Sequence, residues 1–77
     1  MKKVTLELRL REVEKVNEFC KLATQSPCDI TCYSERYIVN GKSILGLYSL
    51  NLLKPITAEV EGEDSDVDVF INSISNL

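Results

Sequence analysis

The stretch that decides the fold is Gly41–Leu50, which reads GKSILGLYSL. The spacing of its apolar side chains predicts a short helix over Ser43–Leu50. Ser43 opens that helix, where a serine hydroxyl can accept a hydrogen bond from a free backbone N–H group and contribute about 1 kcal/mol. At helical spacing Leu47 and Leu50 share the side that would pack on a sheet. Three apolar side chains are then left partly exposed: Ile44, Leu45 and Tyr48.

On both sides of this helix the sequence alternates between apolar and polar residues, which is typical of strands that bury one face. Four segments show the pattern: Lys2–Leu10, Asp29–Ser34, Tyr37–Val39 and Ile56–Glu61. Asn40-Gly41 is a predicted turn because both residues tolerate positive φ, and Gly62 is expected to turn the chain after the last strand.

Two further segments have helical periodicity. One apolar stripe consists of Val13, Val16, Phe19, Cys20 and Ala23, and its helix is predicted to stop at Ser26-Pro27. The other consists of Val67, Phe70, Ile71 and Ile74, with Asp64 or Ser65 as the expected cap. The predicted order is therefore β-α-β-β-α-β-α over one domain, residues 1–77. We expect an open-faced α+β sandwich with three helices on one face of a four-stranded antiparallel sheet.

Composition excludes several classes of function. The net charge of −3 argues against nucleic-acid binding. No apolar run approaches the roughly 20 residues that span a membrane, and we expect no signal peptide. We interpret the acidic residues between 59 and 68 as a solvated edge and a helix start, because they lack the spacing of a calcium loop.

The three cysteines, Cys20, Cys28 and Cys32, include no CxxC pair, and the chain has no histidine. Three thiolates fall short of the four ligands of a zinc site. We therefore predict buried, reduced thiols in a cytoplasmic protein, with no metal and no cofactor.

The segment Lys42–Leu50, KSILGLYSL, is similar to the K-S-I-M-G-[VL]-x-S-L pattern of HPr, the histidine-containing phosphocarrier of the bacterial phosphotransferase system for sugar transport. The predicted element order and the chain length also resemble that family. The resemblance implies the HPr-like open-faced sandwich. It further implies that Ser43 matches a serine that a regulatory kinase phosphorylates in some bacteria, and that the surface of Ile44, Leu45 and Tyr48 docks protein partners.

The family's phosphorylated histidine opens the first helix in a motif similar to G-[IL]-H-A-R-P-A. Counting back from Ser43 without a gap places Glu12 at the histidine position and Glu14 at the position of the phosphate-supporting arginine. A chain without histidine cannot hold phosphate on an imidazole. Two carboxylates there would also repel an incoming phosphoryl group.

These observations predict an HPr-like protein that is not an enzyme and that acts as a non-catalytic regulatory or protein-binding module. Its expected partners are phosphotransferase-system enzymes or an HPr-type serine kinase. Two alternatives stay open. One is an active phosphotransfer component that uses Ser43 or Glu12 as the acceptor. The other is a homo-oligomeric structural module, for example a homodimer.

Overall fold

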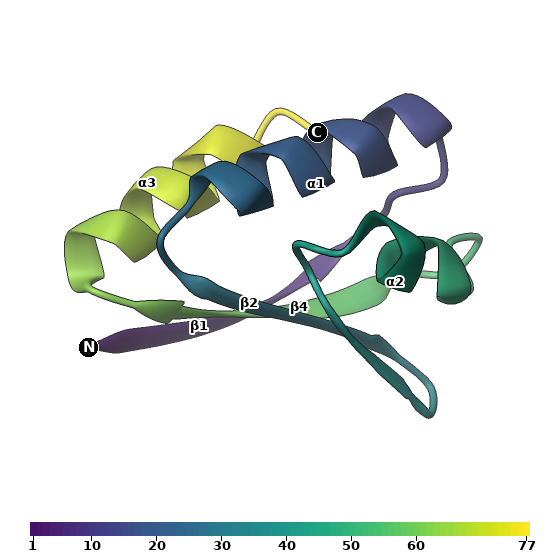
Figure 1. Cartoon of the computed structure of the whole chain (residues 1–77), viewed down its shortest axis with the longest axis horizontal. Helices are drawn as coiled ribbons and strands as arrows, with labels where there is room; N and C mark the ends of the chain where they lie inside the picture. The colour runs from purple at the N-terminus through teal and green to yellow at the C-terminus, as the bar shows by residue number, and fades with distance from the viewer.

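The sheet is the framework of this protein and carries all three helices on one face (Figure 1). The computed structural model describes all 77 residues, Met1–Leu77. Its strands lie in the order β1-β4-β2-β3, and every neighbouring pair is antiparallel. The strands are β1 (Lys2–Leu8), β2 (Asp29–Ser34), β3 (Tyr37–Asn40) and β4 (Ile56–Gly62), and the helices are α1 (Val13–Gln25), α2 (Ile44–Ser49) and α3 (Asp64–Ile74). The predicted β-α-β-β-α-β-α open-faced sandwich is confirmed.

The two faces of the sheet differ because apolar and polar residues alternate along each strand. Ile56, Ala58 and Val60 of β4 point to the helices and are buried. On the edge strand β1 the corresponding side chains are only partly buried. The opposite face carries charged and hydroxyl side chains and is open to solvent, so a one-residue register shift would turn the core side chains outward.

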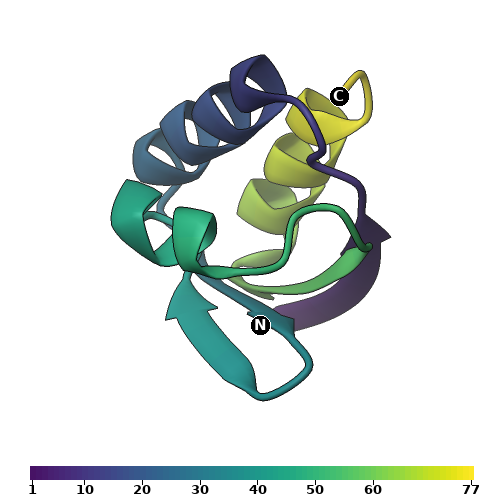
Figure 2. The ribbon, with the colours of Figure 1, turned by 90° about the vertical axis from the view of Figure 1, so that its right-hand side faces the viewer.

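The core lies between the sheet and two helices that run side by side, α1 and α3 (Figure 2). Phe19 of α1 and Phe70 of α3 meet edge to face, with ring centroids 5.8 Å apart and planes 72° apart. This geometry is favourable for aromatic pairs by about 0.5–1.5 kcal/mol beyond the burial of their area. The predicted apolar stripes therefore hold these helices on the sheet, with Val13 as the exception.

Val13 is the first residue of α1 and remains 58% exposed. The helical spacing placed Val13 in the core. That prediction is wrong because no other element covers the first turn of α1. The strand predicted to reach Leu10 ends at Leu8, although Leu10 is buried in the connection that follows.

The turn predicted at Asn40-Gly41 is confirmed, because the backbone N–H of Ser43 donates to the carbonyl oxygen of Asn40 at 2.9 Å, but its backbone conformation differs from the prediction. Neither Asn40 nor Gly41 has positive φ, and the one non-glycine residue that does is Glu35 (φ 53°), in the β2–β3 hairpin turn. Gly41 is needed for a different reason: a Cβ atom there would lie 2.4 Å from Cγ2 of Ile30. Gly62 belongs to β4 and does not form a positive-φ turn.

The start of α3 has no side-chain cap. Glu63 occupies the cap position without a side-chain hydrogen bond, and the helix already begins at Asp64. The prediction that Asp64 or Ser65 caps this helix is therefore wrong. Asp64 and Asp66 lie in the first turn, where their charge interacts favourably with the helix dipole. No helix in the structure is both long enough and apolar enough to span a membrane.

Candidate functional site

The opening of α1 presents two carboxylates to solvent. Glu12 is the N-cap residue in an extended conformation (φ −108°, ψ 141°), and its side chain forms no capping hydrogen bond. Its carbonyl oxygen accepts hydrogen bonds from the backbone N–H groups of Lys15 (3.0 Å) and Val16 (3.1 Å). Glu14 follows in the first turn of the helix and is also exposed. Glu12 and Glu14 therefore lie at the start of the first helix, as the count back from Ser43 predicted.

The electrostatics of this helix start do not favour an incoming phosphoryl group. Neither Glu12 nor Glu14 forms an ion pair with a basic side chain. Each carboxylate near the helix N-terminus stabilises the helix by about 0.3–1 kcal/mol through its interaction with the helix dipole. A phosphoryl group would bring further negative charge close to both. Arg11 and Lys15 are the basic neighbours in the sequence, and neither forms an ion pair with Glu12 or Glu14 that would offset the repulsion.

Helix α2 begins at a side-chain cap. Ser43 has extended backbone angles, and its Oγ accepts a hydrogen bond of 3.0 Å from the backbone N–H of Gly46. Leu47 is completely buried and Leu50, at the C-cap, is 5% exposed, so these two side chains anchor the helix. The structure confirms the predicted cap and the predicted buried side of α2.

Hydrogen bonds fix α2 against α1. The Tyr48 hydroxyl donates to Oδ1 of Asn17 on α1 at 3.0 Å. In the loop before α2, the Lys42 ammonium donates to the backbone carbonyl of Ser26 at 2.9 Å, and the Cys20 thiol lies 3.6 Å from the Lys42 carbonyl oxygen. Because these bonds reach α1 and the turn that follows it, α2 and the flank of α1 form one surface.

The exposed side of α2 is apolar. Leu45 is 82% exposed, Tyr48 43% and Ile44 37%. We call these three residues the α2 surface. Val13 lies one helical turn before Asn17 on the same side of α1, and its side chain is also exposed. The exposure of Val13 was not predicted, because its spacing placed it in the apolar stripe of the helix.

Nothing in the interior resembles a reactive or metal-binding site. All three cysteines are free and buried, as the sequence predicted. Burial raises the pKa of the Cys32 thiol to about 12, which keeps it protonated at neutral pH. Nowhere do three or more cysteine or acidic side chains gather so that they could hold a metal ion.

The open face of the sheet carries a small polar network. The Tyr33 hydroxyl donates to Oε2 of Glu59 at 3.0 Å, and the Lys3 ammonium lies 3.3 Å from Oε1 of the same carboxylate. Both interactions lower the pKa of Glu59, and the bond to Glu59 raises the pKa of Tyr33. The network lies on the face away from α2 and therefore does not contribute to the α2 surface.

Three helices on one face of an antiparallel sheet, with a short second helix beside the first, define the fold class of the small phosphocarrier proteins of the phosphotransferase system. A sequence model described as the PTS HPr component phosphorylation site matches residues 11–77. The chain belongs to the HPr family. The HPr proteins for which the family is named are phosphocarriers rather than catalysts. No curated protein sequence matches the chain.

Solved structures show the same fold. The phosphocarrier protein HPr from Bacillus anthracis strain Ames is 22% identical, with a TM-score of 0.77 over 96% of this chain and 94% of that one. HPr-C-His from Thermoanaerobacter tengcongensis is 24% identical, with a TM-score of 0.74 over 99% and 93% of the two chains. Crh, the catabolite repression HPr of Bacillus subtilis, is 23% identical, with a TM-score of 0.64 over 99% of both chains.

Proposed function

We propose that this chain is a non-catalytic member of the HPr family that regulates or recruits other proteins and does not carry phosphate on a histidine. The observation on which the proposal depends is that no histidine occurs in the chain, while Glu12 and Glu14 open α1. Counting back from Ser43 assigns these two glutamates to the positions of the family's histidine and arginine. Their charges disfavour phosphoryl binding at the helix start.

The proposed partner-binding site is the α2 surface. Exposed apolar residues that gather in one place typically mark a contact site. Tyr48 is a suitable anchor, because its ring is held by Asn17 and would lose little side-chain freedom on binding. The proposed partners are phosphotransferase-system enzymes or an HPr-type serine kinase. The proposal places the chain in the cytoplasm, where three free thiols stay reduced.

Titration of the isotope-labelled chain with enzyme I of the phosphotransferase system, followed by NMR, tests the docking site. We expect shifts centred on Leu45 and Tyr48 and weaker binding in Leu45→Asp and in Tyr48→Asp. Leu53→Asp is the matched control, because Leu53 is 73% exposed but lies outside the α2 surface. Equal loss of binding in Leu53→Asp, or shifts that avoid α2, would contradict the assignment.

Ser43 is the proposed site of regulation. Its Oγ now accepts the hydrogen bond of Gly46. A phosphate ester would place about −1.5 to −2 charges beside the apolar α2 surface, which disfavours docking of an apolar partner. HPr kinase with ATP should therefore label the chain, and Ser43→Ala should abolish the label. Ser49→Ala is the control, since it removes an exposed hydroxyl of the same helix. A label that persists in Ser43→Ala would refute the role of Ser43.

A further inference from the structure

The free edge of β1 is the least protected part of the sheet. β1 is the outermost strand next to β4, and it pairs without interruption from Lys2 opposite Gly62 to Leu8 opposite Ile56. It therefore contains no bulge, and its sequence KKVTLEL contains no proline. The other edge strand, β3, has only four residues. Long, regular edges without bulges or prolines readily pair with another strand, but lysines on an edge oppose such pairing. The lysines of β1, Lys2 and Lys3, must therefore lie near opposite charges in any paired arrangement.

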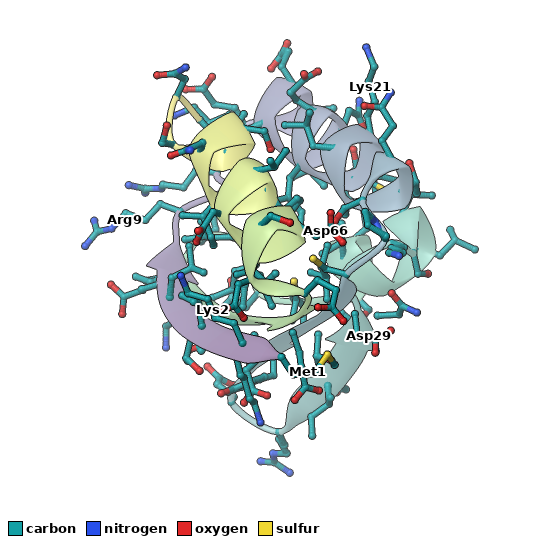
Figure 3. The ribbon with its side chains drawn as sticks, turned by 90° about the vertical axis from the view of Figure 1, so that its left-hand side faces the viewer. Met1, Lys2, Arg9, Lys21, Asp29 and Asp66 are labelled. Carbon is teal, nitrogen blue, oxygen red and sulfur yellow. The ribbon has the colours of Figure 1, made fainter.

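A groove beside this edge is apolar. It lies between β1 and α3. Its apolar lining is Leu6, Leu8, Ile71, Ile74 and Leu77, and its polar lining is Glu7, Arg9, Lys15 and Ser75. Figure 3 shows β1 passing beneath α3, with Lys2 near its start and Arg9 projecting beyond its end. The core-facing side chains of β1 are only partly buried, whereas those of its neighbour β4 are fully buried. Apolar area at this edge is thus left for an adjacent strand to cover.

The sequence of β1 is complementary to itself. A second copy related by a two-fold axis must place residues of the same face opposite each other, so the axis must pass through one residue. With the axis at Thr5, Lys3 lies opposite Glu7 of the second copy, and Val4 lies opposite its Leu6. This register pairs all seven residues of the strand and places opposite charges together twice.

Neighbouring registers are less favourable. An axis at Val4 places Lys3 opposite Thr5 and leaves Glu7 outside the paired strands. An axis at Leu6 places Glu7 opposite Thr5 and leaves Lys3 without an opposite charge within β1. The remaining charges at the start of the strand are already neutralised within the chain, because Lys2 lies 2.6 Å from Asp68 and the N-terminal amine 3.7 Å from Asp64.

We propose that two copies of this chain associate through antiparallel pairing of their β1 strands about Thr5, which joins their sheets into one of eight strands. Glu7 is exposed and forms no ion pair within its own chain. Lys3 lies 3.3 Å from Glu59 of its own chain, and in the dimer its exposed ammonium is shared between Glu59 and Glu7 of the other copy. The α2 surface lies beside β3 at the opposite side of the sheet and remains free in the dimer (Figure 2).

Sedimentation velocity from low micromolar to near-millimolar concentration tests the proposal. We expect a reversible monomer–dimer equilibrium. Glu7→Lys turns two attractive cross-strand pairs into two repulsive ones, and at about 0.2–1 kcal/mol a pair it should raise the dimer dissociation constant about tenfold or more. Glu18→Lys makes the same charge change on the exposed face of α1 and should leave the equilibrium unchanged.

Mixing Glu7→Lys chains with Lys3→Glu chains tests the proposed register most directly. The mixture restores both opposite-charge pairs and should form a heterodimer with a dissociation constant at least tenfold lower than that of either variant alone. Circular dichroism checks that each variant is folded, since Lys3→Glu also breaks the ion pair with Glu59. A wild-type chain that is monomeric at every concentration would overturn the proposal. So would a dimer dissociation constant that is unchanged in Glu7→Lys, or one that rises equally in Glu18→Lys.

Discussion

Two leucines of α2, Leu45 and Leu47, allow the packing of this helix to be tested with a matched pair of substitutions. Leu47 is completely buried and Leu45 is 82% exposed. Leu47→Ala removes the anchor of the helix and leaves a cavity, which costs about 2–5 kcal/mol. Leu45→Ala changes the same side chain in the same helix without a cavity, so its effect should stay within about 0.5 kcal/mol.

The expected loss is large relative to the stability of the whole domain. At about 0.05–0.15 kcal/mol per residue, the free energy of unfolding of a chain of this length is roughly 4–12 kcal/mol. A loss of about 3 kcal/mol should lower the Tm by roughly 12–24 °C, since each kcal/mol corresponds to about 4–8 °C at this size. Urea unfolding followed by circular dichroism measures both variants, and the slope m should not change. Similar losses in Leu45→Ala and Leu47→Ala would refute the assigned orientation of α2.

Three further outcomes are expected. The pKa of Cys32 is about 12 in the folded chain, against a usual 9.0, so the free energy of unfolding should fall as the pH rises above 9.0. In urea titrations, Cys32→Ala should make this decrease at alkaline pH smaller. Tyr33→Phe should raise the pKa of Glu59 towards its usual 4.5, measured by NMR of the carboxyl carbon. It should also reduce the stability lost as the pH falls below that value, and an unchanged Glu59 titration would contradict the hydrogen bond. Gly41→Ala should cost about 1–3 kcal/mol in thermal unfolding, because its Cβ would collide with Ile30, and a neutral substitution would contradict this close approach.

The sequence was sufficient to predict the order of the elements and the orientation of α2, because these follow from local periodicity. Alternation defined the four strands, and two turns of helix cannot bury Ile44, Leu45, Leu47, Tyr48 and Leu50 together. The exposure of Ile44, Leu45 and Tyr48 could therefore be predicted from the sequence alone.

Other features depend on contacts between distant parts of the chain. Val13 fits the apolar stripe of α1, but no element covers the first turn of that helix. Gly41 lies in the predicted turn but does not have positive φ, and glycine is needed there because a Cβ atom would collide with Ile30 on the neighbouring strand. Asn17 is 31 residues from Tyr48 in the sequence, and only the folded chain brings the two together. Tertiary proximity of this kind leaves no periodic signal in the sequence.

The structure also separates the two proposed surfaces. The α2 surface is apolar and lies beside β3, whereas the β1 edge is a line of backbone groups flanked by Lys3 and Glu7 on the opposite side of the sheet. A dimer joined through β1 would present two α2 surfaces to a partner. Binding to a surface-immobilised partner should therefore gain avidity in the wild-type chain and lose it in Glu7→Lys.

The central claim, that this HPr-family chain does not act as a phosphocarrier, is tested most directly by incubation with phosphoenolpyruvate and enzyme I followed by intact-mass measurement. A histidine-containing HPr in the same reaction serves as the positive control. The account predicts that the control gains the mass of a phosphoryl group and that this chain does not. A mass gain in this chain that disappears in Glu12→Gln would contradict the account and identify Glu12 as the acceptor.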